Sequence, residues 1–280
     1  MPNPSAISEK NRLTVGLFAR VIILAFILLL LSIPVYLEAS NPGHQVVIVS
    51  AAQGSPPNPK QVIVISLDVP IDQGSSSLVS RAISTAQADK ASAIIINMNT
   101  PGGLLQDMVS IVDSISNSTA SGIPVYTYVG NDSLAASAGS YIAMASVKIF
   151  MGPGSQIGPS TPIVEGGSAL QQNHTAGAML TLMTSLAQQN GRNITAASQM
   201  VTYDIAYSYS DALKYHVADN SSLSFAQTLE LLNLSGAAVA TISESPTEQL
   251  ISFLSNPTVD GIILLIGVIA ISVDIYHPTV

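Results

Sequence analysis

The middle of the chain alternates short β-branched apolar runs with segments that carry apolar side chains at helical spacing. The runs are typical of buried strands and occupy residues 61–69, 93–98, 123–129 and 147–151. Residues 75–90 and 105–115 show the helical spacing between them. Strands that alternate with helices form βαβ units, in which helices cover a parallel sheet. The sequence therefore predicts an α/β domain with a largely parallel sheet.

The second half of the chain is predicted to be mostly helical. Apolar periodicity indicates helices at residues 175–189, 195–200, 208–215 and 224–234. Residues 152–174 are rich in Gly, Pro, Ser and Gln, so we expect a long loop there. Loops of this length often act as lids or binding loops, and others are simply disordered.

The N-terminal segment combines basic residues with an apolar run. Lys10, Arg12 and Arg20 precede the run at residues 21–31. This pattern is typical of a cleaved signal peptide or of a membrane anchor, and residues 1–40 fit both. Either alternative keeps the basic end in the cytoplasm and sends the following chain outside. Residues 41–59 end in a Gly/Ser/Pro cluster typical of a linker.

The C-terminal segment is apolar as well. Residues 261–273 read GIILLIGVIAISV, a run that is short for a membrane span and that a buried core helix also allows. Its terminal position favours a second membrane segment, and we expect the natural protein to continue beyond Val280. The predicted organisation is a domain at residues 60–245 followed by the start of a membrane region at 246–280.

Charge and cysteine content exclude several functions. Residues 41–258 carry six Lys/Arg and thirteen Asp/Glu, a balance that argues against binding to nucleic acid or to anionic lipid. The chain has no cysteine, which excludes disulfides and cysteine-type zinc sites. Asn-x-Ser/Thr sequons, a weak sign of an extracytosolic location, occur at Asn117, Asn131, Asn173, Asn193, Asn220 and Asn233.

A glycine turn follows the second predicted strand. Residues 100–103 read Thr-Pro-Gly-Gly and precede a predicted helix. Glycines at such a turn allow backbone amides to point at a ligand beside the positive end of the helix dipole. This arrangement can stabilise a developing oxyanion. Glycine-rich turns between strands and helices are also common for packing reasons alone.

A serine among small residues follows the third predicted strand. Residues 135–139 read Ala-Ala-Ser-Ala-Gly, so Ser137 is sterically open, as a nucleophile must be. Close packing of a small-residue helix against the sheet is the simpler explanation of this segment alone. Ser133 and Ser140 are the neighbouring alternatives, and Ser133 would also suit a helix cap.

Taken together, the motifs resemble a known family. TPGG, IPVYTYV and AASAGSYIAMA, in this order and followed by GPGSQIGPSTPI, resemble the Clp-protease (ClpP)/crotonase superfamily. They are most similar to the NfeD-type membrane-bound serine proteases, relatives of signal-peptide peptidase A. The likeness continues through SLAQQNGRN, DALKYHV and the terminal apolar segment, and covers roughly residues 60–280. The resemblance implies a Clp-protease/crotonase-like fold of repeated ββα/βαβ units, flanked by terminal transmembrane segments.

The resemblance also implies roles for individual residues. The amide of Gly103 (or Gly102) and that of Ala138 would form the oxyanion hole, and Ser137 would form the acyl-enzyme. The family pairs its serine with a lysine immediately before the SLAQxxGRN stretch, and this chain has Thr184 there. Threonine has no pKa near neutrality and cannot act as a general base by itself.

Other residues of the chain are poor substitutes for the missing lysine. His174 in the predicted long loop could fold over the site, although a loop histidine is more often solvated. Lys148 falls in the short fourth strand. By the resemblance, His216 lies where the family has a domain-closing helix, far from the expected site. Asp132 precedes Ser137 on a turn, where turn residues are common.

Three functions remain open on the sequence. The first is a membrane-bound serine endopeptidase that cleaves hydrophobic peptide segments of membrane proteins, with a stomatin-like protein as substrate or partner by resemblance. The second is a catalytically inactive homologue that acts as a membrane scaffold or peptide-binding module, because Thr184 replaces the lysine. The third is acyl-CoA chemistry with Asp107 as acid or base, which an extracytosolic domain disfavours. Neither cofactor nor metal is expected, and the resemblance implies homo-oligomers and contact with membrane lipid.

Overall fold

The computed structural model describes residues 60–164 and 166–276. The described chain divides after Glu248 into a large unit and a smaller C-terminal unit, each considered by itself. The predicted signal peptide or anchor and the linker, residues 1–59, lie outside the described residues.

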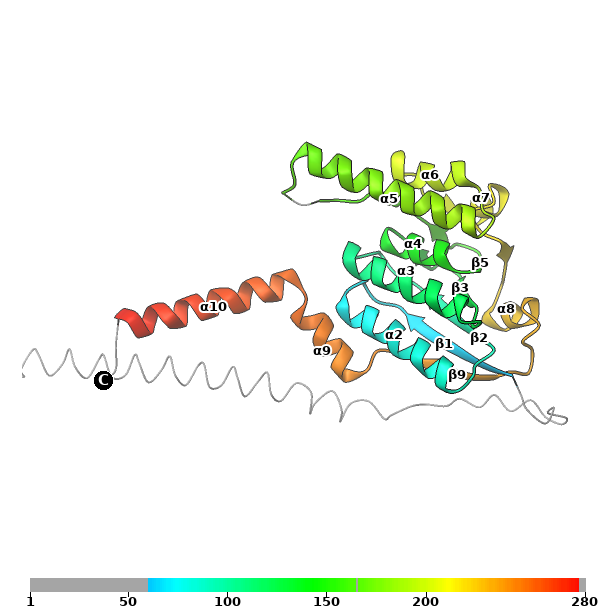
Figure 1. Cartoon of the computed structure of the whole chain (residues 1–280), viewed down its shortest axis with the longest axis horizontal. Helices are drawn as coiled ribbons and strands as arrows, with labels where there is room; N and C mark the ends of the chain where they lie inside the picture. Colours follow the sequence, from blue (N-terminus) through cyan, green and yellow to red (C-terminus); the bar gives the residue numbers. More distant parts are fainter. Residues whose placement is uncertain (1–59, 165, 277–280) are drawn as a thin grey trace, which may run out of the picture. The chain divides into compact units, whose positions relative to one another are not determined.

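The large unit is built on a six-stranded sheet in which every pairing is parallel. The strand order is β8-β5-β3-β2-β1-β9 (Figure 1). The strands are β1 (Gln61–Leu67), β2 (Ala93–Met98), β3 (Val125–Val129), β5 (Lys148–Met151), β8 (Asn220–Ser221) and β9 (Ala238–Ile242). The predicted α/β class with a parallel sheet is confirmed, and β8 and β9 are strands that the sequence patterns did not predict.

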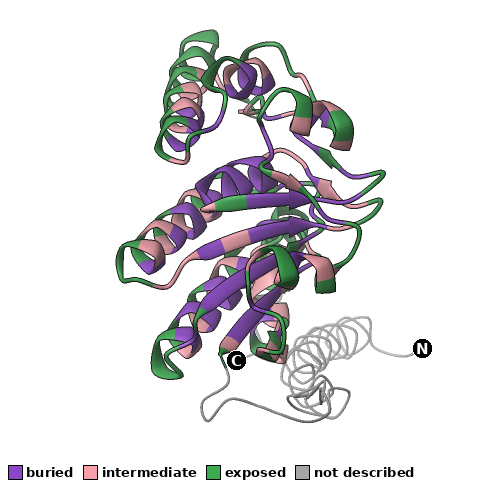
Figure 2. Ribbon diagram, turned by 90° about the vertical axis from the view of Figure 1, so that its right-hand side faces the viewer, coloured by how far each residue is buried: buried purple, intermediate pink, exposed green. Residues whose placement is uncertain are grey.

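Side chains of alternating positions cover the two faces of the sheet. Ile63 and Ile65 of β1 pack in the larger hydrophobic core, whereas Val62 and Val64 pack in a second cluster on the opposite face. Helices α2 (Gln73–Ala88), α3 (Leu105–Ala120) and α4 (Ala138–Ala145) cover the first face, and α8 (Phe225–Leu231) covers the second. Figure 2 shows the central strands buried between these layers, as continuous apolar runs require.

A second, three-stranded sheet lies near the site described below. It has the order β4-β6-β7, with β4 at Leu134–Ala135, β6 at Gln156–Ile157 and β7 at Tyr207–Ser208. Helix α7 (Tyr209–Lys214) packs against it, and α5 (Ala169–Gln189) and α6 (Ile194–Thr202) pack against each other.

The prediction of a long loop at 152–174 is partly wrong, because α5 begins at Ala169 and contains His174. Its start is fixed by a capping box, in which Ser168 and Gln171 each bond the other's backbone N–H.

The C-terminal unit consists of helical chain. Helix α9 (Pro246–Leu254) starts at the end of the large unit, and α10 (Pro257–Tyr276) carries the predicted apolar run. Within the described residues no single helix has the length and hydropathy of a membrane span. Helix α9 together with residues 257–272 of α10 meets that standard as a pair bent by 67°. The second membrane segment stays a prediction.

Candidate active site

The candidate site lies at the carboxyl edge of the main sheet, where the turns after β2 and β3 meet. Because β1, β2 and β3 are parallel, their carboxyl ends share one edge. The turn after β2 carries the TPGG segment at residues 100–103, and the chain after β3 carries Ser137. In open α/β sheets, ligands bind outside the carboxyl ends of the strands.

Asn99 joins three segments at this edge. Its side-chain amide donates to a carboxylate oxygen of Asp68, after β1, at 2.7 Å. Its side-chain oxygen accepts from the backbone N–H of Leu134, in β4, at 3.1 Å. The sequence patterns did not single out Asn99, although its place one residue after a buried strand was a signal that could have found it.

Thr100 pairs the glycine turn with the segment that carries Ser137. Its backbone N–H donates to Leu134 O at 2.8 Å, and its carbonyl accepts from Ala136 N–H at 3.1 Å. Its buried hydroxyl oxygen accepts from the N–H of Gly102 at 3.2 Å. These bonds bring the two predicted motifs side by side.

Ser137 has a strained backbone at the start of α4. Its dihedral angles are φ 50° and ψ −120°, a region that non-glycine residues rarely occupy. Its N–H donates to Pro159 O at 2.8 Å, and its carbonyl accepts from the hydroxyl of Ser140 at 2.6 Å. Its own hydroxyl makes no hydrogen bond to any described residue and does not cap the helix. The hydroxyl of Ser137 is therefore available for chemistry.

The glycines of the turn are required by two close approaches. A Cβ on Gly102, whose φ is +105°, would collide with the Cβ of Ser137. A Cβ on Gly103 would collide with the backbone of Ile71, because Leu104 and Gly102 pair with that residue at 2.7 and 2.8 Å. A side chain at either position would push the turn away from Ser137.

Two backbone amides near Ser137 lack an acceptor among the described residues. They are the N–H of Gly103 and that of Ala138, the first residue of α4. The N–H of Gly102, in contrast, is bonded to Thr100. Amides at a helix start carry partial positive charge, so they suit an oxyanion. Of the two predicted glycines, Gly103 is the one with a free amide.

The alternative serines are engaged elsewhere. Ser140 is fully buried, and its hydroxyl bonds both the carbonyl of Ser137 and the hydroxyl of Ser160 at 2.6 Å. Ser133 lies on the turn before β4, where its hydroxyl bonds Asn131 O at 3.3 Å. Among the three serines, only Ser137 combines partial exposure with an unbonded hydroxyl.

Thr184 lies on α5, which packs against α4. It is half-buried, one residue after the fully buried Met183. Its hydroxyl donates back into its own helix, to Leu180 O at 2.8 Å with Thr181 O at 3.1 Å. No hydrogen bond joins Thr184 to Ser137 in the described chain, so its hydroxyl oxygen does not act on the serine in this arrangement.

No hydrogen bond joins any of the substitute bases to Ser137 in the described chain. His174 is exposed on α5, ten residues before Thr184, which is about 15 Å along a helix. Lys148 is exposed at the first residue of β5, the end of that strand opposite to the site edge. His216 and Asp132 are exposed turn residues with left-handed backbones.

An acidic pair flanks the glycine turn. Asp72 caps α2 next to Ile71, and Asp107 lies in the first turn of α3. Burial, and then the negative charge of Asp72, raise the pKa of Asp107 above its ordinary value. No hydrogen bond joins Asp107 to Ser137 in the described chain, and the described residues hold no group of three metal-ligating side chains. Acid–base chemistry by Asp107 stays a prediction.

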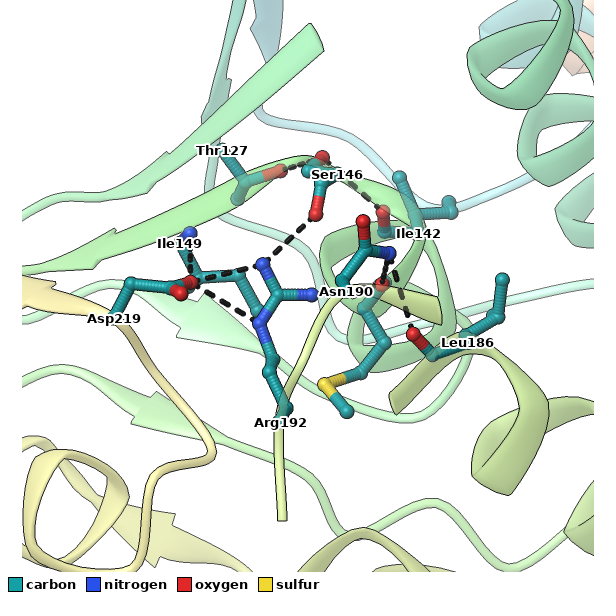
Figure 3. A network of polar contacts seen from close by, with 9 residues as sticks. Thr127, Ile142, Ser146, Ile149, Leu186, Asn190, Arg192 and Asp219 are labelled. Atoms are coloured by element: carbon teal, nitrogen blue, oxygen red, sulfur yellow. Dashed lines mark hydrogen bonds and ion pairs between the residues drawn. The ribbon is translucent and has the colours of Figure 1, made fainter. Parts of the chain in front are cut away.

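A buried network fixes α5 and the segment after it against the end of α4 (Figure 3). The guanidinium of Arg192 donates to Met144 O and Ser146 O at 2.8 Å each, and forms an ion pair with Asp219 at 2.9 Å. Asn190 adds a bond to Met144 O at 2.9 Å. Because these carbonyls end the helix that Ser137 begins, the network sets where Thr184 stands relative to the site.

The chain is similar in sequence to known proteins. The sequence model of the NfeD1b N-terminal domain matches residues 61–242. The chain is 33% identical over 219 residues to the membrane-bound protease PH1510 of Pyrococcus horikoshii, covering 71% of this chain and 49% of the relative. It is 28% identical over 232 residues to the membrane protein NfeD1b of Bacillus subtilis, covering 78% and 52%. The chain spans about half the length of these relatives.

A solved structure extends the comparison to three dimensions. The 1510-N membrane-bound stomatin-specific protease, as a lysine-to-alanine variant in complex with a substrate peptide, superposes with a TM-score of 0.61. The two sequences are 31% identical, and the match covers 71% of this chain and 99% of that structure. The fold of the described domain is therefore that of a solved peptidase domain.

Proposed function

This chain belongs to the NfeD1b family by its N-terminal domain, and from that membership we propose that it is a membrane-bound serine endopeptidase with Ser137 as nucleophile. The proposal rests above all on Ser137 itself. Its strained backbone, its unbonded hydroxyl and the contact with Gly102 are what a preorganised nucleophile beside an oxyanion site requires. The free amides of Gly103 and Ala138 supply that oxyanion site.

The proposed substrate is a hydrophobic segment of a membrane protein. Leu104 and Leu105, exposed directly after the oxyanion glycine, offer apolar contact to such a segment. The relative of known structure is named as stomatin-specific, so a stomatin-like protein is the proposed partner. The domain acts on the outer side of the membrane, as the basic N-terminal residues predict, and works as a homo-oligomer in contact with lipid.

A second candidate function is a peptide-binding membrane scaffold without turnover. The observation that favours it is the hydroxyl of Thr184, which is bonded to its own helix and gives Ser137 no base. The related lysine-to-alanine variant was solved with a substrate peptide, so peptide binding in that protein does not need the lysine side chain. This fold can therefore hold a peptide whether or not it cleaves it.

The two functions differ in the reactivity of Ser137. We expect the full chain in detergent to react slowly with a fluorophosphonate probe, with the adduct on Ser137 by mass spectrometry. Thr184→Lys should raise hydrolysis of an apolar peptide by ~10²–10⁴-fold, the usual contribution of a general base. Desolvation by the apolar neighbours would lower the pKa of the new lysine and keep part of it neutral.

Three variants complete the experiment. Ser137→Ala, alone and with Thr184→Lys, should abolish both readouts, whereas Ser133→Ala should retain them. Wild-type turnover as fast as that of Thr184→Lys would show that another base exists, and His174→Ala would then be measured. An apolar peptide that binds without any probe adduct, in wild type and in Thr184→Lys alike, would establish the scaffold function instead.

A further inference from the structure

The Asn-x-Ser/Thr sequons are a feature that peptidase chemistry does not use, and the structure separates them. At Asn193 and Asn233 the asparagine and the hydroxyl residue two positions later are all exposed, and neither asparagine lies within a helix or strand. A transferase must reach both side chains, and at Asn193 the hydroxyl residue Thr195 lies in the first turn of α6. These two sequons are accessible in the folded domain.

Asn193 is the residue before α6. Its side-chain oxygen accepts from the N–H of Ala196 at 3.1 Å, and its backbone N–H donates to His216 O at 3.1 Å. The side-chain nitrogen has no partner among the described residues. A sugar on that nitrogen would leave the capping oxygen in place, so modification and the helix cap are compatible.

Asn233 lies on the turn between α8 and β9. Its backbone has φ +55°, and its carbonyl accepts from the Lys60 ammonium at 3.2 Å. Its side chain makes no hydrogen bond to a described residue. Ser235 is exposed two residues later. The turn sets the direction of the Asn233 side chain, and no hydrogen bond to the described residues holds its amide group.

Two sequons are closed by the fold. In Asn117-Ser118-Thr119, on α3, the Thr119 hydroxyl oxygen is buried without a partner. In Asn220-Ser221-Ser222 the hydroxyl of Ser222 is buried and bonded to Ser224 O and Thr228 at 2.8 Å. They provide matched negative controls.

The remaining two sequons meet the criteria in part. Asn173 lies within α5, and the hydroxyl residue after Asn131, Ser133, is only half-exposed.

The surface offers a physical reason for such a modification. Charged residues make up 9% of the chain, whereas about 25% is usual in soluble domains. Two of the few cations, Arg81 and Arg192, are engaged in ion pairs within the domain. A surface with so few charged side chains carries few strongly hydrated groups, and a hydrated oligosaccharide adds such groups without adding charge.

We propose that the folded domain carries N-linked oligosaccharide at Asn193 and Asn233. The donor is a lipid-linked oligosaccharide phosphate on the outer side of the membrane. The amide nitrogen forms a bond to the sugar C1, the C1–O bond to phosphate breaks, the lipid phosphate leaves with that electron pair, and the amide proton passes to the transferase's base. The inference rests on the outer orientation included in the proposed function, and it does not depend on peptidase activity.

The experiment measures occupancy on the full chain isolated from the membranes of its own cells. Peptide mass mapping should find hexose-containing adducts at Asn193 and Asn233 and unmodified peptides at Asn117 and Asn220. Thr195→Ala should remove the adduct at Asn193 while the capping asparagine remains. Thr195→Ser should retain the adduct, because it retains the hydroxyl.

The outcomes are distinguishable from those of the peptidase assay. Unmodified Asn193 and Asn233 would overturn the inference whatever Ser137 does. Equal occupancy at Asn117 and Asn220 would overturn the role of the folded state, because those sequons are closed in it. External protease applied to intact cells measures the orientation separately, and a protected domain would also overturn the inference.

Discussion

Replacing Arg192 with methionine should destabilise the large unit more than any surface change. The Arg192 side chain is 2% exposed and makes four hydrogen bonds, two to the carbonyls of Met144 and Ser146 and two to Asp219. Burial lowers the pKa of Arg192 and Asp219 acts to raise it, so the cation depends on its partners. Methionine matches the length of the stem but removes every donor.

The magnitude follows from what the substitution leaves unpaired. Removing one member of a buried ion pair costs about 3–5 kcal/mol. Asp219 is 25% exposed and keeps the bond from Ile149 N–H at 2.7 Å, and Met144 O keeps the bond from Asn190. We therefore expect the lower end, about 3 kcal/mol. For a domain of this size that loss lowers Tm by roughly 6–12 °C.

Thermal unfolding of the full chain in detergent, followed by circular dichroism, measures this loss. Arg192→Lys should lower stability less than Arg192→Met does, because its ammonium group keeps the positive charge. It should still lower stability, because an ammonium cannot reach all three acceptors of the guanidinium. Lys214→Met, which removes an exposed cation stacked on Tyr215, should change stability by no more than about 0.5 kcal/mol. An Arg192→Met variant as stable as Lys214→Met would refute the role assigned to the network.

Three further changes have defined expectations. Gly102→Ala should abolish probe labelling and lower Tm, because the added Cβ would collide with Ser137. Gly177→Ala, with open space around it in α5, should raise stability by up to about 1 kcal/mol. Thermal melts and probe labelling of both variants test this pair. Burial acts to raise the pKa of Glu248, but bonds from Arg81 and Ser245 outweigh it, so the folded pKa is lowered. The ionised Glu248 carboxylate therefore stabilises the folded chain at pH values above its ordinary pKa. This stabilisation is lost as the pH falls through the lowered pKa of the folded state. Glu248→Gln should therefore flatten the acid side of a Tm–pH profile.

The main sheet was predictable because its central strands are continuous β-branched runs. β1, β2, β3 and β5 fall within the predicted ranges, since strands buried on both faces need apolar residues at nearly every position. β8 was missed because two residues carry no period, and it forms only by pairing with β5. The start of α5 was missed although the Ser-x-x-Gln capping signature is present in the sequence.

The candidate site was predictable in part. The family resemblance that the glycine turn and the Ser137 segment carry implied their association, and the bonds of Thr100 bring them together. Asn99 and Arg192 escaped prediction because their partners lie 35 and 48 residues away, beyond any local pattern. Polar residues of this kind gain their roles only from tertiary contacts.

The residues of the candidate site come from different elements, and this arrangement bears on which of the two proposed functions the chain performs. Ser137 and the free amides lie at the start of α4 and in the turn after β2, whereas Thr184, at the proposed lysine position, lies on α5. Substitution at Thr184 therefore leaves the backbone of Ser137 unchanged. A backbone held at φ 50° and ψ −120° costs of order 1–3 kcal/mol, which surrounding bonds must offset. A scaffold that only binds peptide gains nothing from a strained serine with an unbonded hydroxyl. Retained strain without a base therefore favours slow acyl transfer over no chemistry, because preorganised amides accelerate the reaction even when proton transfer falls to water.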